Sequence, residues 1–226
     1  MTRDGFETVV DRLRAALEAP SASARLQTAM AAGLRPADDY IDALVERFAV
    51  EPDFFVRDML TWALLQHDRA RTLERVLPEL RSVFPQSRSQ ALHTLSKLGE
   101  RSAWPAITTD LLLDSEDEVA RTAWRAAATL VPAQEAPALA EVLASQFGRG
   151  DRATQRGLSR ALAMLGDAAA AVIARGKLSR EPGVSAHAHA TEQMVKDPDV
   201  GFDVAIAAAQ RTLALRGAPL VGDVEA

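Results

Sequence analysis

The chain has 226 residues, 48% hydrophobic and 25% charged, a balance typical of a folded protein with a sizeable core. Alanine and leucine are abundant and only 5% of the residues are aromatic, which favours helices throughout. The net charge of −5 argues against a general nucleic-acid binder, and the absence of cysteine excludes disulfides, thiolate catalysis and cysteine-ligated zinc.

The predicted helices alternate in two sets along the chain. First helices are expected at residues 4–18, 37–49, 68–83, 102–113, 133–147 and 167–178. Each is followed by a second helix, whose first buried position is here called the anchor. The anchors are Ala22, Val56, Ser87, Val119, Thr154 and Val184. They lie 34, 31, 32, 35 and 30 residues apart, and the residues four and seven positions later are mostly apolar or small, which indicates a repeated helix pair.

The ends of the second helices carry matching signals. Asp53 stands where an N-cap is expected, three residues before the anchor Val56. Repeats three and five end in Leu-Gly, with Gly99 and Gly166 suited to a helix C-terminus. A last helix at about 199–216 is expected to cap the stack. We therefore predict one domain over residues 1–217 and a flexible tail at 218–226.

The turn and the start of the second helix resemble a HEAT repeat, most closely the short bacterial phycobilisome-lyase HEAT-like kind. The residues that carry the resemblance are Asp53, Val56, Arg57, Leu60, Ser87, Arg88, Ala91, Asp117, Val119, Arg121 and Ala123. It implies an all-α, right-handed α-solenoid of about six helix pairs plus a C-terminal capping helix. Ala120, Gln155 and Ser185 replace the arginine that follows the anchor, so the turn-bridging role of that arginine should be weaker in repeats four to six.

By the same resemblance, the second helices line a concave surface. At about 100° per residue, the positions two, five, six and nine after the anchor point away from the buried face. This predicted exposed ladder includes Asp58, Thr61, Leu92, Ser159, Ala186 and Ala190. The candidate partner-binding residues within it are Trp62, His93, Arg121, Trp124, Arg125, Arg156 and Arg160.

In this interpretation the two tryptophans make apolar contacts, and the four arginines hold a carboxylate-rich peptide, a phosphate or a nucleic-acid backbone. A second interpretation stays open, in which the tryptophans pack against the next repeat and the arginines pair with Glu116 and Glu118. The first predicts a non-enzymatic scaffold or adaptor for a protein or acidic peptide partner. No segment has the length of a signal peptide or a membrane span, so we expect a cytoplasmic protein.

Catalytic, metal and cofactor sites are not indicated. His187 and His189 diverge by about 200° on a helix, so they cannot ligate one ion from one face. One alternative is a HEAT-like DNA-binding protein or an alkylated-base DNA glycosylase. Glycosylases of HEAT-like fold use a concave aspartate flanked by tryptophans, which Asp58 near Trp62, with Trp124 further along, loosely resembles. A further alternative, a small-molecule-binding solenoid, would need a closed apolar pocket.

Overall fold

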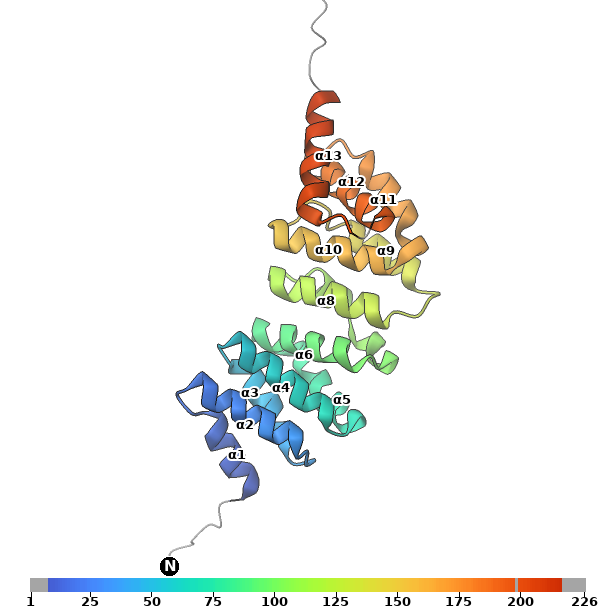
Figure 1. Cartoon of the computed structure of the whole chain (residues 1–226). Helices are drawn as coiled ribbons and strands as arrows, with labels where there is room; N and C mark the ends of the chain where they lie inside the picture. The colour runs from blue at the N-terminus through green and yellow to red at the C-terminus, as the bar shows by residue number, and fades with distance from the viewer. Residues whose placement is uncertain (1–7, 198, 217–226) are drawn as a thin grey trace, which may run out of the picture. The chain divides into compact units, whose positions relative to one another are not determined.

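The computed structural model describes residues 8–197 and 199–216, and every regular element in those ranges is a helix (Figure 1). The predicted all-α fold is therefore confirmed, while the tail predicted at 218–226 lies outside the described residues. The chain divides into two compact units, Met1–Ala126 and Ala127–Ala226. Each unit is described by itself, and the single domain over residues 1–217 stays a prediction.

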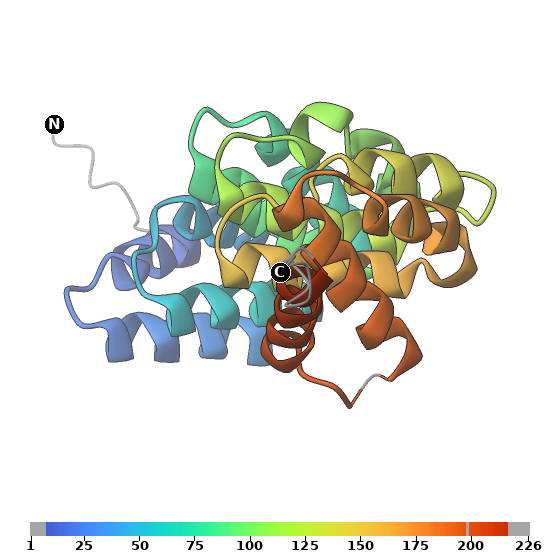
Figure 2. The ribbon, with the colours of Figure 1, turned by 90° about the horizontal axis from the view of Figure 1, so that it is seen from above.

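The first unit contains three complete helix pairs and most of a fourth. Its helices are α1 (Val9–Leu17), α2 (Ala22–Leu34), α3 (Tyr40–Val50), α4 (Phe54–Gln66), α5 (Arg69–Val76), the 3₁₀ helix η1 (Leu77–Arg81), α6 (Pro85–Leu98), the 3₁₀ helix η2 (Arg101–Ala106), α7 (Thr109–Leu112) and the part of α8 (Asp117–Leu130) up to residue 126. The second helices pack in sequence order, α2 on α4 and α4 on α6 (Figures 1 and 2).

The second unit holds the remaining pairs and the last helix. Its helices after α8 are α9 (Ala136–Ala144), α10 (Arg152–Met164), the 3₁₀ helix η3 (Gly166–Ala169), α11 (Ala170–Lys177), α12 (Pro182–Lys196) and α13 (Phe202–Arg216). Here α12 packs on α10 and α11. Stacked helix pairs of this kind are the building plan of an α-solenoid. Its handedness stays a prediction.

The predicted register of the second helices is confirmed at the position seven after the anchor, which is buried in all six repeats. These residues are Ala29, Ala63, Thr94, Ala126, Ala161 and Thr191. The Asp53 carboxylate caps α4 as predicted, since it accepts hydrogen bonds from the Phe55 and Val56 amides at 2.9 and 3.1 Å. Gly99 ends α6 with a φ of 69°, in the left-handed region that glycine adopts without strain.

Arginines near the start of the second helices hold the turns that precede them. The Arg57 guanidinium donates to the carbonyls of Glu51 and Pro52 at 2.9 and 2.8 Å. Arg25 and Arg88 each donate in the same way to the carbonyls five and six residues earlier. In repeat five the Gln155 amide replaces the guanidinium and reaches two turn carbonyls at longer distances of 3.4 and 3.3 Å. Glutamine therefore keeps the bridge in a weaker form.

Glu51, at the end of α3, is a fully buried carboxylate in the first unit. Both of its oxygens accept hydrogen bonds from Arg25 at 2.7 Å, and one accepts two from Arg47 at 2.8 and 2.7 Å. Burial alone would raise the pKa of Glu51, but these hydrogen bonds and one from the Asp53 amide lower the pKa to about 2. The carboxylate therefore stays charged and ties α2 to the turn between α3 and α4.

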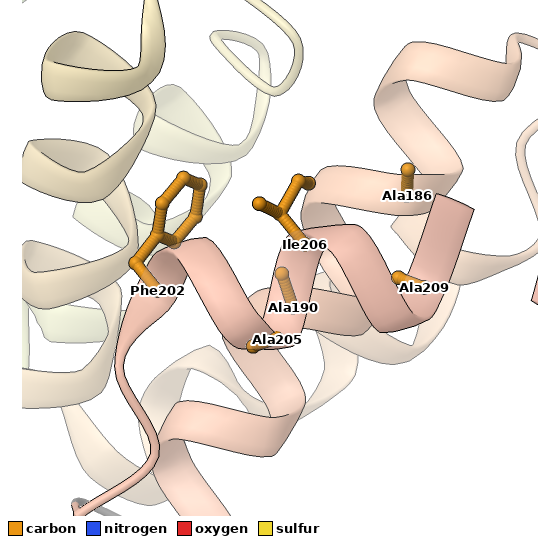
Figure 3. Packing of buried hydrophobic residues seen from close by; sticks show 6 residues of the cluster. All are labelled: Ala186, Ala190, Phe202, Ala205, Ile206 and Ala209. Atoms are coloured by element: carbon orange, nitrogen blue, oxygen red, sulfur yellow. The ribbon is translucent and has the colours of Figure 1, made fainter. Parts of the chain in front are cut away.

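The last helix, α13, packs against α12 as the predicted capping helix (Figure 3). Phe202, Ile206 and Ala209 of α13 form one buried cluster with Ala186 and Ala190 of α12. The prediction that Ala186 and Ala190 are exposed is therefore wrong. They lie two and six positions after the anchor of repeat six, and α13 covers that face.

Candidate partner-binding face

The position five after the anchor, predicted to be exposed, is buried in repeats two to five. Its residues there are Thr61, Leu92, Trp124 and Ser159. The Thr61 hydroxyl accepts a hydrogen bond from Gln90 of the next second helix at 2.6 Å. Likewise, the Ser159 hydroxyl lies 2.7 Å from that of Thr191 on α12. A helix inside a stack has neighbours on both sides, so its exposed strip is narrower than that of a helix packed on one side.

Trp124 is a candidate site residue at this position that was predicted to be exposed. Its side chain is 0% exposed, and its indole N–H donates to the Leu112 carbonyl at 2.8 Å. The prediction that Trp124 lies on the exposed face is therefore wrong. Tryptophan is large and apolar with one polar atom, and here the neighbouring first helix supplies the hydrogen-bond acceptor for that atom.

Trp62 is half-buried and packs against α2. A Cβ placed on Gly33 would lie only 2.5 Å from Cζ3 of Trp62 and 2.9 Å from Cα of Ala63. The absence of a side chain at Gly33 therefore lets α2 and α4 approach closely, with the indole against the α2 backbone. Both sequence interpretations hold in part for Trp62, because its ring is packed on a neighbouring repeat and still partly exposed.

His93 of α6 lies among charged side chains of three second helices. Its Nε2 is 3.8 Å from a carboxylate oxygen of Asp58 on α4. Burial and the nearby charges of Arg125 and Lys97 lower the pKa of His93, and Asp58 opposes them. His93 is therefore neutral near pH 7. Lys97 lies about one helical turn after His93 on the same face of α6.

Arg121 lies one helical turn before Arg125 on α8 and is half-buried, whereas Arg125 is exposed. Trp62, His93 and Arg125 occupy the position six after the anchor on three successive second helices, and Lys97 and Arg121 lie one turn away from His93 and Arg125. These five residues are here called the inner-face patch. It combines three cationic side chains with an aromatic ring and a neutral imidazole. All five residues belong to the first unit.

The two remaining candidate arginines lie in the second unit. Arg156 of α10 donates to the Asp203 carboxylate of α13 at 2.7 Å. Arg152, one turn earlier, donates to the Gln210 side chain of the same helix at 3.1 Å. Arg160 is exposed. Because the four arginines are divided between two units, the expectation that they form one patch across two neighbouring repeats stays a prediction.

From residue 8 to residue 126, the most exposed aromatic side chains are ones that the sequence reasoning missed. Phe54 and Phe55 open α4 and are 65% and 70% exposed, and Phe84 before α6 is 61% exposed. The Phe54 and Phe55 rings meet edge to face at 5.6 Å. Their signal in the sequence is their place in the first turn after the cap residue Asp53. Exposed apolar groups of this size are typical of contact surfaces.

A cavity of about 150 Å³ opens between the N-terminal ends of α4, α6 and α8. It is lined by Arg57, Pro85, Gln86, Ser89, Gln90, Glu116, Glu118 and Val119. Glu116 and Glu118 line this cavity and form no ion pair within the described part of the chain, contrary to the predicted pairing with arginines. The lining is mainly polar, so the cavity is not the apolar pocket that the small-molecule alternative requires.

His187 has a structural role in the second unit. Its Nδ1 accepts a hydrogen bond from the Gly148 amide at 3.0 Å, and its Nε2 lies 2.9 Å from the Gln155 carbonyl. The ring is fully buried, and burial lowers the pKa of His187 to about 4. Among residues 8–197 and 199–216, no three histidine or carboxylate side chains are grouped to hold a metal ion.

The arrangement proposed for a glycosylase is only partly assembled. Asp58 is exposed and lies 3.8 Å from His93, whereas Trp124, expected further along the same exposed face, is buried. In the described ranges, none of the helices combines the length and apolar character needed to span a bilayer.

Comparison with known proteins gives likenesses of fold only. No family model matches the chain, and no curated protein matches it. Human deoxyhypusine hydroxylase in complex with glycerol is 16% identical with a TM-score of 0.45, over 96% of this chain and 90% of that chain. The complex of CpcE and CpcF of phycocyanin lyase from Nostoc is 18% identical with a TM-score of 0.37, over 94% of this chain and 97% of that chain. With TM-scores below 0.5, neither likeness carries an argument about function.

Proposed function

We propose that the chain is a non-enzymatic scaffold or adaptor that binds an acidic helical segment of a partner protein on the exposed face of its second helices. The inner-face patch is the contact site. Arg121, Arg125 and Lys97 supply positive charge for carboxylates, and the exposed part of Trp62 supplies apolar contact.

The observation that carries the proposal is the way α13 is held within the second unit. α13 packs on Ala186 and Ala190, the positions two and six after the anchor of α12. In repeats two to four of the first unit these positions carry Asp58 and Trp62, Ser89 and His93, and Arg121 and Arg125. The Asp203 carboxylate of α13 binds Arg156, which has the same position in repeat five as Arg121 in repeat four. The chain thus contains one example of a helix held on this face in part through an aspartate.

A defined peptide tests the proposal. The probe is a fluorescein-labelled amphipathic helical peptide with two aspartates on one face, titrated with the full chain and followed by fluorescence anisotropy. The Arg121→Gln/Arg125→Gln variant should bind about tenfold more weakly, since each exposed ion pair contributes roughly 0.2–1 kcal/mol. The matched control, Arg12→Gln/Arg81→Gln, removes the same charge from two exposed arginines elsewhere in the first unit and should bind like the wild type.

Two outcomes would refute the proposal. One is equal weakening in both double variants, which would indicate attraction by net charge alone. The other is equal affinity for a peptide whose two aspartates are replaced by asparagine. Capture from native lysate then identifies the partner, as the protein retained by the wild type and the control variant but lost from Arg121→Gln/Arg125→Gln.

A further inference from the structure

The cavity between the starts of α4, α6 and α8 has an unusual distribution of hydrogen-bonding groups. Two of its lining residues are glutamines, one on each of two successive turns of α6. The Gln86 side-chain nitrogen donates to the carbonyls of Phe48 and Glu51 at 3.0 and 2.9 Å. Since carbonyl oxygens only accept, both amide hydrogens are committed and the orientation of the amide is fixed.

Gln90 is bound in the same way, although it is only 8% exposed. Its nitrogen donates to the Arg57 carbonyl at 3.2 Å and to the Thr61 hydroxyl at 2.6 Å. In each glutamine, the Oε1 atom is therefore the group that can still accept a hydrogen bond from a ligand. Within the described part of the chain, neither Oε1 atom accepts a hydrogen bond. Neither belongs to the buried polar atoms that lack a partner, so both Oε1 atoms are accessible to solvent. Each amide thus keeps an accessible oxygen, on a residue that lines the cavity.

The other lining groups are also mainly acceptors. Ser89 is 8% exposed, and its hydroxyl lies 3.1 Å from that of Thr122, which in turn donates to the Glu118 carbonyl at 2.8 Å. Ser89 therefore donates to Thr122 and keeps its lone pairs. The Glu116 and Glu118 carboxylates add two negative charges. The one cation in the lining, Arg57, already uses its Nη1 to hold the turn before α4.

We propose that this cavity binds a guanidinium group. A guanidinium carries five N–H donors in a plane and one positive charge, which complements amide oxygens, a hydroxyl and two carboxylates. The volume of about 150 Å³ is about five times the share of one water molecule in the liquid, so it suits an organic cation better than a bare metal ion. The group can come from an arginine side chain of a peptide or from a small guanidine compound. This inference does not depend on the proposed function, which concerns acidic ligands and other residues.

Titration of the full ¹⁵N-labelled chain with methylguanidinium, followed by ¹H–¹⁵N NMR, tests the site. We expect saturable shifts of the Gln86 and Gln90 side-chain signals. Glu116→Gln/Glu118→Gln should weaken binding about tenfold, because two exposed carboxylates are neutralised. Glu18→Gln/Glu74→Gln changes the net charge equally at two exposed glutamates outside the cavity and should stay within about twofold of the wild type.

The Arg57→Gln variant should raise the affinity for methylguanidinium, whereas the Glu116→Gln/Glu118→Gln variant should lower it. Gln155 shows that glutamine can bridge the same turn in repeat five, so the fold should be retained while the repelling charge is removed. Affinity for methylguanidinium should then rise about threefold. A variant that loses affinity while its circular dichroism is unchanged would contradict the assignment of Arg57 as the repelling charge.

A second arm distinguishes the sources of the group. If acetyl-Gly-Arg-Gly-amide binds more tightly than methylguanidinium and responds to the same variants, the ligand is an arginine side chain. If methylguanidinium binds more tightly, it is a small guanidine compound, and either result supports the site. The proposal is overturned if neither probe gives saturable shifts, if both double variants weaken binding equally, or if calcium chloride alone produces the shifts.

Discussion

Replacing the buried Glu51 by glutamine should destabilise the first unit by about 3 kcal/mol at pH 7. The pKa of Glu51 is lowered from 4.5 to about 2, and each pKa unit corresponds to about 1.4 kcal/mol of stability once the group is ionised in both states. Loss of one partner of a buried ion pair typically costs about 3–5 kcal/mol. Glutamine has nearly the same shape but leaves the Arg25 and Arg47 charges without a carboxylate.

The effect should depend on pH in a defined direction. Because the folded-state pKa is below the unfolded value, the stabilisation is fully present above pH 4.5 and is lost as the pH falls toward 2. With these two values, about 2 kcal/mol of it disappears between pH 7 and pH 3. The difference between wild type and Glu51→Gln should therefore shrink from about 3 to about 1 kcal/mol over that range.

Urea unfolding followed by tryptophan fluorescence measures the free energy of unfolding of the first unit selectively. The chain has three tryptophans, Trp62, Trp104 and Trp124, and all lie in the first unit. Glu46→Gln is the control, since Glu46 forms only an exposed ion pair with Arg14 and should cost less than about 0.5 kcal/mol. A loss below about 1 kcal/mol for Glu51→Gln at pH 7, or a loss that is the same at pH 7 and pH 3, would refute the reasoning.

Two further predictions concern one residue in each unit. Gly33→Ala should destabilise the first unit by about 1–3 kcal/mol in urea unfolding, because its Cβ would lie 2.5 Å from the Trp62 ring and 2.9 Å from the Ala63 backbone. Adding Trp62→Leu to this variant should recover part of the lost stability. No recovery would show that the contact with Ala63 dominates. In the second unit, the pKa of His187 is about 4 in the folded state against 6.5 in the unfolded state. As the pH falls from 7 to 4, the unfolded chain binds the proton first, so the unit should lose about 3 kcal/mol of stability. Circular dichroism during urea unfolding follows this loss, and an equal loss in His187→Gln would contradict it.

The sequence predicted the helices because their signals are local. A cap at Asp53, a glycine at position 99 and the apolar spacing after each anchor depend on residues within a few turns of one another. The burial of all six residues seven positions after the anchor follows from the same spacing. For these features one helix contains all the information that is needed.

The candidate site was less predictable because exposure depends on neighbouring helices. Trp62 and Trp124 both occupy positions predicted to be exposed, yet one packs on Gly33 and the other is enclosed beside Leu112. Helix periodicity identifies the face that a helix turns toward its own partner. It does not say which flank the next repeat will cover, and a difference of one position turns a side chain by about 100°.

The sequence by itself thus determined the helical fold, the repeat length and the identity of the charged residues on the second helices. Only the tertiary structure decided that Arg156 is paired with Asp203, that Glu51 is enclosed by two arginines, and that Gln86 and Gln90 line one cavity. The physical reason is the distance along the sequence over which the interactions act. Helix formation is set by contacts within a few residues, whereas these pairings join side chains that only packing between helices brings together.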